Sequence, residues 1–194
     1  MSTKISIEIP TQLHDAAKSF PRVRSDEEVM SALIDTSRKA ISWQLGGPFA
    51  AAIIRSDTFE LISLGVNLVL NQQLSTLHAE MVAIMLAQRQ LGTFDLATAP
   101  APLTLYTTCE PCTMCLGASH WSGVSRVVCS AADSDAAAAG FDEGPKPEDW
   151  AKALRERGIE VVEGLLRRDA AAVLAEYKSR GGEIYNSLNN QSEH

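Results

Sequence analysis

Three of the four cysteines lie within one stretch of nine residues, which carries the strongest chemical signal in the chain. Cys109, Cys112 and Cys115 recur at every third position, directly after residues 103–106, whose side chains alternate as in a strand. Packing of an apolar core gives no reason for such a spacing, whereas clustered thiols are typical metal ligands. The stretch therefore predicts a metal site, and the question is which thiols bind the metal.

A histidine and a glutamate upstream complete the candidate metal centre. His78 precedes Cys112 by 34 residues, and Glu80 stands two positions after His78. A catalytic zinc has three protein ligands and a water or hydroxide in the fourth position, and it lowers the pKa of that water to about 7. A nearby carboxylate then carries the proton. We therefore expect one Zn²⁺ per chain, held by His78, Cys112 and Cys115, with Glu80 as general acid and base.

Two other metal sites compete for the same thiols. A closed structural zinc would add Cys109, but it would leave Glu80 without a role, and Cys109 is expected to end a strand. A bacterial ferredoxin-type cluster would need a further cysteine where Ser119 stands. Cys109 and Cys129 are therefore expected to be packing residues.

The elements around these residues alternate between helices and strands. Ser25 starts a predicted helix that reaches about Gln44, and His78 starts another that ends near Gly92. Pro111 suits the first turn of a third, which runs to about Trp121. Strands are expected at 49–54, 61–70, 102–107, 125–131 and 159–164, and further helices at 131–139, 147–158 and 166–180. About five strands alternating with helices predict a three-layer α/β domain.

Two segments flank the predicted domain, which covers residues 25–165. Residues 1–24 contain alternating isoleucines and then two prolines, which predict an extended N-terminal arm without chemistry of its own. Residues 166–194 are expected to form a C-terminal helix followed by a polar tail.

Composition favours a small substrate over a macromolecular one. The 194 residues are 45% hydrophobic, and the net charge is −7 with basic residues interleaved among acidic ones. Nucleic-acid binding relies on basic clusters that displace counterions, and a membrane-spanning helix needs roughly 20 apolar residues. The sequence has neither, and its cysteines are not spread as a disulfide framework would be. We therefore expect a cytoplasmic protein without a nucleic-acid or membrane partner.

The motif His78-Ala79-Glu80 followed by Pro111-Cys112-x-x-Cys115 matches the signature of zinc deaminases. From about residue 27 to 165 the chain resembles the cytidine deaminase superfamily. Residues 108–118 and 47–51 look most like its bacterial guanine deaminase branch, and the loop 140–145 is similar to that of a subgroup that also accepts the triazine ammeline. The resemblance implies a three-layer α-β-α fold with a mixed sheet, and hydrolysis of guanine to xanthine and ammonia.

The resemblance also implies substrate contacts that the residue types alone would not reveal. Asn67 is implied to hydrogen-bond the purine, Phe49 to stack on it, Ala79 to contact it and Trp121 to help wall the pocket. Glu143 is implied to help protonate the leaving amine. Without the family, Asn67 would be a strand-edge amide, the two aromatic residues would be core residues, and Glu143 would be a solvated charge.

A homodimer is likewise implied, in which residues 166–194 are exchanged between subunits and Tyr185 covers the active site. Other substrates stay open at this point, namely cytosine, guanosine, another triazine or the adenosine of a tRNA, although the acidic charge disfavours the last. A zinc-stabilised binding module without turnover is the alternative of a different class. It would have no use for Glu80 and would close its metal site with Cys109.

Overall fold

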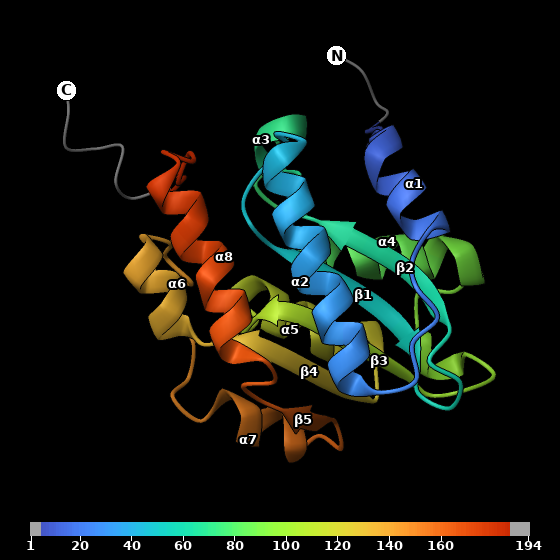
Figure 1. Ribbon diagram of the computed structural model, residues 1–194. Helices are drawn as coiled ribbons and strands as arrows, with labels where there is room; N and C mark the ends of the chain where they lie inside the picture. Colours follow the sequence, from blue (N-terminus) through green and yellow to red (C-terminus); the bar gives the residue numbers. More distant parts are fainter. Residues whose placement is uncertain (1–4, 187–194) are drawn as a thin grey trace.

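The computed structural model describes residues 5–186, in which a five-stranded mixed sheet lies between two layers of helices (Figure 1). The strand order is β2-β1-β3-β4-β5; β1 pairs antiparallel with β2 and β3, whereas β3, β4 and β5 run parallel. The strands are β1 (Ala50–Arg55), β2 (Leu61–Val66), β3 (Leu103–Cys109), β4 (Arg126–Ala131) and β5 (Glu160–Val162). The predicted α/β fold with a mixed sheet is confirmed.

Helices cover both faces of the sheet, with α1, α2 and α8 on one face and α4 and α5 on the other (Figure 1). The long helices are α2 (Asp26–Ser42), α4 (Ala79–Leu91), α5 (Thr113–Ser122) and α8 (Arg167–Ser179). Short helices are α1 (Thr11–Lys18), α3 (Val69–Gln72), α6 (Asp133–Ala139), α7 (Trp150–Arg155) and the 3₁₀ turn η1 (Leu96–Thr98). None of the helices within residues 5–186 is long and apolar enough to cross a bilayer.

Each face of the sheet has its own apolar core, because successive strand residues point to opposite faces. Along β1, Ala52 and Ile54 belong to the core under α2, whereas Ala51 and Ile53 belong to the core under α4. Gly65 in β2 allows α4 to lie directly on the sheet, since a Cβ at this position would come within 2.3 Å of the Ala79 carbonyl oxygen. This close approach fixes the N-terminal end of α4.

An ion pair ties α2 to the sheet on the face opposite α4. The Arg126 guanidinium donates to both carboxylate oxygens of Asp26, at 2.9 and 2.6 Å, and the Tyr106 hydroxyl donates to the same carboxylate at 2.6 Å. The hydrogen bond from Arg126 lowers the pKa of Asp26 below its ordinary value. Together these bonds fasten the first turn of α2 to β3 and β4.

The structure corrects two of the predicted elements. Residues 1–24 do not form only an extended arm, because Thr11–Lys18 is helix α1, whose Leu13 is buried in the core. The second strand ends at Val66 instead of residue 70, because the Asn67 side-chain oxygen accepts from the backbone N–H of Val69 and turns the chain. Asn67 therefore follows a strand and does not lie within one.

Candidate metal centre and substrate pocket

Two helix N-termini converge just beyond the carboxyl end of β3. His78 is the N-cap of α4, Cys112 is the N-cap of α5, and Cys115 lies in the first turn of α5. Helix α5 therefore starts two residues after Pro111, slightly later than predicted. The three ligand atoms lie within 4.8 Å of one another, and His78 Nδ1 lies 3.4 Å from Cys112 Sγ. A tetrahedral zinc, with Zn–N about 2.0 Å and Zn–S about 2.3 Å, places such ligand atoms roughly 3.6 Å apart.

The electrostatics of the three side chains also suit a cation. A hydrogen bond from Cys115 lowers the pKa of Cys112 to about 4, and the same bond, together with burial, raises the pKa of Cys115 well above its ordinary value. Burial opposes the charged form of His78, but the hydrogen bond and charge of Cys112, together with the charges of Glu80 and Glu143, raise the pKa of the imidazole. The two thiols thus share one proton in the protein alone. A divalent cation would replace this shared proton, and the two helix N-termini favour the thiolates it needs.

The other two cysteines lie outside this cluster. Cys109 ends β3 and is 2% exposed, and Cys129 is fully buried in β4. Burial raises the pKa of both thiols, that of Cys129 to about 12. Within residues 5–186 the only three-residue cluster suited to a metal is His78, Cys112 and Cys115. The expected set of three ligands is confirmed, and a closed site that includes Cys109 is not.

Glu80 lies against the metal residues and is almost completely buried. It is the second residue of α4 and is 7% exposed. Its Oε1 accepts from the Thr107 hydroxyl at 3.1 Å, and its Oε2 accepts from Cys115 Sγ at 3.4 Å. Burial raises the pKa of this carboxyl group, which suits a group that takes up a proton and returns it.

Thr107 was not anticipated as a functional residue. Its side chain shares a strand face with Leu105, which belongs to the core under α4. Alternation along β3 therefore points the hydroxyl toward the helix that carries Glu80. This strand parity is the signal that sequence analysis could have used.

A cavity of about 510 Å³ opens beside the metal residues. Five of the six additional residues predicted to act on the substrate line it, namely Phe49, Asn67, Ala79, Glu143 and Tyr185. Phe141 also lines the cavity and packs edge-on against Phe49 at 4.8 Å between ring centroids. Sequence analysis gave Phe141 no role of its own within the loop.

Trp121 does not line this cavity, which corrects the prediction that it walls the pocket. Its side chain is 81% exposed near the C-terminal end of α5. Cys115, Ser119 and Ser122 form the buried face of this helix. At 100° per residue, Trp121 lies about 200° around the helix from Ser119 and so points away from the sheet.

Both the oxygen and the nitrogen of the Asn67 side-chain amide form hydrogen bonds. The residue is 1% exposed, and its Oδ1 accepts from the backbone N–H groups of Gly47 and Val69 at 3.4 and 3.2 Å. Its Nδ2 donates to the hydroxyl of Tyr185 at 2.8 Å. The Tyr185 ring lies 6.3 Å from the His78 ring, so the C-terminal segment of this chain covers its own cavity. Asn67 thus combines the local backbone role of a turn amide with a place in the cavity wall.

Glu143 enters the cavity from the loop between α6 and α7. It is partly buried, and its backbone oxygen accepts from the N–H of Thr113 at 3.0 Å. Burial, aided by the nearby charges of Cys112 and Glu80, raises the pKa of Glu143 to about 8. A raised pKa favours the protonated form of this carboxyl group, which can donate a proton.

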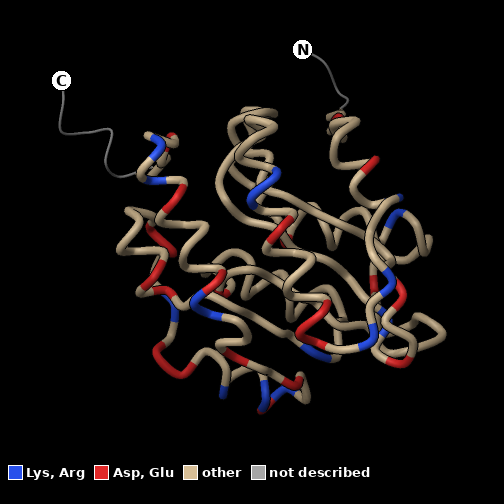
Figure 2. The backbone as a smooth tube through the Cα atoms, viewed as in Figure 1, with Lys and Arg blue, Asp and Glu red and all other residues tan. Residues whose placement is uncertain are grey.

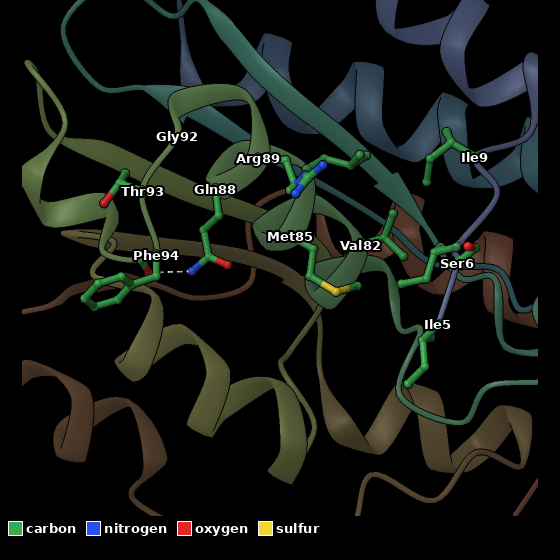
Figure 3. A pocket seen from close by; sticks show the side chains of 12 residues that line it. Ile5, Ser6, Ile9, Val82, Met85, Gln88, Arg89, Gly92, Thr93 and Phe94 are labelled. Atoms are coloured by element: carbon green, nitrogen blue, oxygen red, sulfur yellow. Dashed lines mark hydrogen bonds between the residues drawn. The ribbon is translucent and has the colours of Figure 1, made fainter. Parts of the chain in front are cut away.

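A larger hollow of about 1180 Å³ lies between α4 and residues 5–9 (Figure 3). Ile5, Ile9, Val82 and Met85 are among the apolar side chains around it, and among residues 5–186 Arg89 is the only charged residue that lines it. This hollow lacks the acids, thiols and imidazole that the smaller cavity brings together. The chemistry therefore belongs to the smaller cavity.

Comparison with known proteins relates these residues to zinc deaminases. Residues 23–131 match the family model described as the cytidine and deoxycytidylate deaminase zinc-binding region. The guanine deaminase of Bacillus subtilis (strain 168) is 35% identical over 133 residues, which cover 69% of this chain and 81% of that protein. A tRNA-specific adenosine deaminase of Haemophilus influenzae is 35% identical over 126 residues, which cover 65% of this chain and 68% of that protein.

Similarity to a solved structure extends over nearly the whole chain. The structure of guanine deaminase from Nitrosomonas europaea is 41% identical to this chain, with a TM-score of 0.88. The match covers 92% of this chain and 98% of that one.

Proposed function

The chain belongs to the cytidine and deoxycytidylate deaminase family, and from this premise we propose that it is a zinc-dependent guanine deaminase that hydrolyses guanine to xanthine and ammonia. The observation that carries the proposal is that one cavity holds two acids, Glu80 against the metal residues and Glu143 on the facing loop. The two relatives described as guanine deaminases support the substrate.

Different residues of the cavity can carry out the successive steps of the reaction. Zinc held by His78, Cys112 and Cys115 would activate water for attack and act as a Lewis acid. Glu80 takes a proton from the attacking water and delivers it to a ring nitrogen of guanine as the new C–O bond forms at C2. Glu143 donates a proton to the leaving amine. The C2–N bond then breaks as the C2 hydroxyl becomes a carbonyl, and the proton that the hydroxyl gives up restores the acid form of Glu143 when ammonia and xanthine are released.

The walls of the cavity would orient the base for this attack. Asn67 supplies an amide for the polar edge of the purine once Tyr185 yields its hydrogen bond. Phe49, steadied by the edge-on contact with Phe141, offers a ring face for stacking. Ala79 lines the cavity between the metal residue His78 and the acid Glu80. Tyr185 closes the cavity above the base.

Ammeline is proposed as a second substrate because of the loop 140–145. Ammeline presents an amino-bearing carbon flanked by ring nitrogens, as guanine does at C2. The same two acids would serve both compounds, since the proton transfers occur at a ring nitrogen and at the leaving amine in each case.

A tRNA substrate is disfavoured, although a tRNA-specific adenosine deaminase is among the relatives. The net charge is −7, and Figure 2 shows Lys and Arg scattered among Asp and Glu. Binding of an RNA stem would require these basic residues to gather on one face. Tyr185 also lies over the cavity, where a polynucleotide would have to enter.

A homodimer is proposed, with the outer faces of α4 and α5 as its interface. Phe94, three residues after the end of α4, is 85% exposed, and Trp121 on α5 is 81% exposed. Large apolar side chains exposed in this way are typical of surfaces that bind another protein. Exchange of residues 166–194 is not needed to cover the cavity, because Tyr185 covers that of its own chain. The thiol ligands require a reducing compartment, which supports the predicted cytoplasmic location.

Ammonia release from a panel of compounds tests the proposed function. The panel contains guanine, guanosine, ammeline, cytosine, cytidine and adenine, with the zinc-loaded protein. We expect the highest kcat/KM for guanine and measurable turnover of ammeline. Failure of guanine alone within an otherwise active panel would overturn the substrate assignment.

A further inference from the structure

Lys146 follows the Glu143 loop and is buried among the residues that precede the metal ligand Cys112. We propose that Lys146 is a positioning residue that sets the place of Glu143 relative to the metal centre. The inference rests on the proposed function, since it concerns the acid that would protonate the leaving amine. Lys146 lies outside the cavity lining and would act only through the loop.

The three N–H groups of the Lys146 ammonium are all used by neighbouring acceptors. Nζ donates to Asp133 Oδ1 at 2.6 Å, to Glu110 Oε2 at 3.2 Å and to the carbonyl oxygen of Pro111 at 3.2 Å. An ammonium group has three donors and no acceptor, so the site satisfies it completely. The Trp150 ring packs below it, with Nζ 4.9 Å from the ring centroid.

Two of these acceptors belong to the residues next to a metal ligand, so the ammonium contacts the chain beside the metal centre. Glu110 and Pro111 are the two residues immediately before Cys112. Thr113, immediately after Cys112, donates from its backbone N–H to the backbone oxygen of Glu143 at 3.0 Å. The loop thus binds the chain on both sides of Cys112. The Glu143 backbone accepts from the residue after Cys112, and the Lys146 side chain donates to the two residues before it.

Burial makes the lysine hard to replace. Its side chain is 4% exposed, and that of Glu110 is 16% exposed. Removal of the ammonium would leave the Glu110 carboxylate partly buried without its cation, which favours movement of both segments toward water.

Two substitutions of Lys146 and one matched control test the proposal. Lys146→Met keeps the apolar stem and removes the charge, whereas Lys146→Arg keeps the charge but presents a planar fork that cannot meet the same three acceptors. Arg167→Met is the control, because Arg167 donates to Asp135 at 2.7 Å on the same short helix α6 as Asp133 but does not touch the loop. Each variant is assayed for zinc content, kcat and KM with guanine.

We expect Lys146→Met to retain one zinc per chain and a KM within about threefold of wild type, with kcat lowered about 100-fold, the size of loss expected from a misplaced catalytic group. Lys146→Arg should recover about tenfold of that loss and stay about tenfold below wild type, and Arg167→Met should leave kcat unchanged. Should Lys146→Met fail to fold, Lys146→Arg alone decides. A kcat about tenfold below wild type at unchanged KM supports the proposal, and a wild-type kcat overturns it.

A Glu143→Gln background separates positioning of Glu143 from a general structural effect. If Lys146 acts through Glu143, adding Lys146→Met to that background lowers kcat by no more than about threefold further, because the losses of coupled residues do not add. A second loss of about 100-fold, or loss of zinc from Lys146→Met, overturns the proposal.

Hydrogen–deuterium exchange of residues 140–145 provides a readout that does not depend on turnover. We expect exchange at least tenfold faster in Lys146→Met than in wild type or Arg167→Met, and equal exchange would count against the proposal. A wild-type protein inactive on guanine would refute the proposed function, while this measurement still decides whether Lys146 holds the loop.

Discussion

The two acids of the cavity are held by different parts of the molecule. Glu80 belongs to the first turn of α4, lies between that helix and β3, and accepts a hydrogen bond from the buried Thr107. Glu143 belongs to a loop between short helices and is held there through Thr113 and, three residues later, Lys146. Glu80, beside the metal residues, is thus part of the core. Glu143, which would protonate the leaving amine, lies on a loop that is bound to the core by hydrogen bonds.

This difference indicates how the two functions separate. The position of Glu80 depends on the close approach of α4 to the sheet at Gly65. Any side chain at position 65 would disturb this approach. The loop site depends on a few polar contacts that can change without rebuilding the core. Zinc binding and activation of the attacking water should therefore tolerate changes in the loop. Protonation of the leaving amine should be sensitive to such changes.

Glu80→Gln is expected to have the largest effect. The amide keeps the shape of the side chain but cannot take a proton, so kcat for guanine should fall by at least about 10³-fold, within the range attributed to general acid–base catalysis. Zinc content should stay at one per chain, because Glu80 is not a ligand. Metal analysis and ammonia release on the same sample check both statements, and appreciable xanthine formation would remove Glu80 from the mechanism.

Thr107→Val tests whether the core also positions Glu80. Loss of the hydroxyl leaves Glu80 Oε1 without its donor, and we expect kcat to fall about tenfold, the equivalent of roughly 1.4 kcal/mol in the barrier. Thr104→Val is the matched control, since Thr104 is equally buried in β3 but contacts Ser56 at 2.8 Å, away from the cavity. Equal losses of kcat in the two variants would contradict a specific role for Thr107.

Asp26→Asn should have the smallest effect on activity, because it lies on the other face of the sheet. We expect an unchanged kcat and a free energy of unfolding lowered by about 1–3 kcal/mol at pH 7, since a hydrogen bond to a charged group is lost. The pKa of Asp26 is lowered in the folded state, so its contribution is complete above the unfolded value of about 3.9 and is lost as pH falls through the folded value. Urea unfolding at pH 7 and below pH 4 should show the difference between wild type and variant shrinking.

The same division explains what could be predicted from the sequence. His78, Glu80, Cys112 and Cys115 have fixed spacings at two helix starts. Helix geometry places Cys112 and Cys115 on one face, and the match to the zinc deaminase signature joined them to His78 and Glu80. Glu143 and Asn67 gained roles only through resemblance to a family, because their positions depend on long-range contacts with Thr113 and Tyr185.

The failures have equally local causes. Trp121 was placed in the pocket from resemblance, although its position relative to the buried residues of α5 points it outward. Helix α1 was missed because the isoleucine alternation before Pro10 outweighed the short helical segment of eight residues around Leu13. Lys146 stood in a predicted loop, and no spacing in the sequence indicates that three acceptors from two other segments meet its ammonium.

Guanine turnover by Glu143→Gln tests the central claim most directly, because it asks whether the loop acid serves the leaving group while the core site stays intact. The amide cannot donate the proton that ammonia needs, so we predict one zinc per chain, KM within about threefold of wild type and kcat lowered by at least about 100-fold. A kcat close to that of wild type would return Glu143 to a solvated charge and contradict the account.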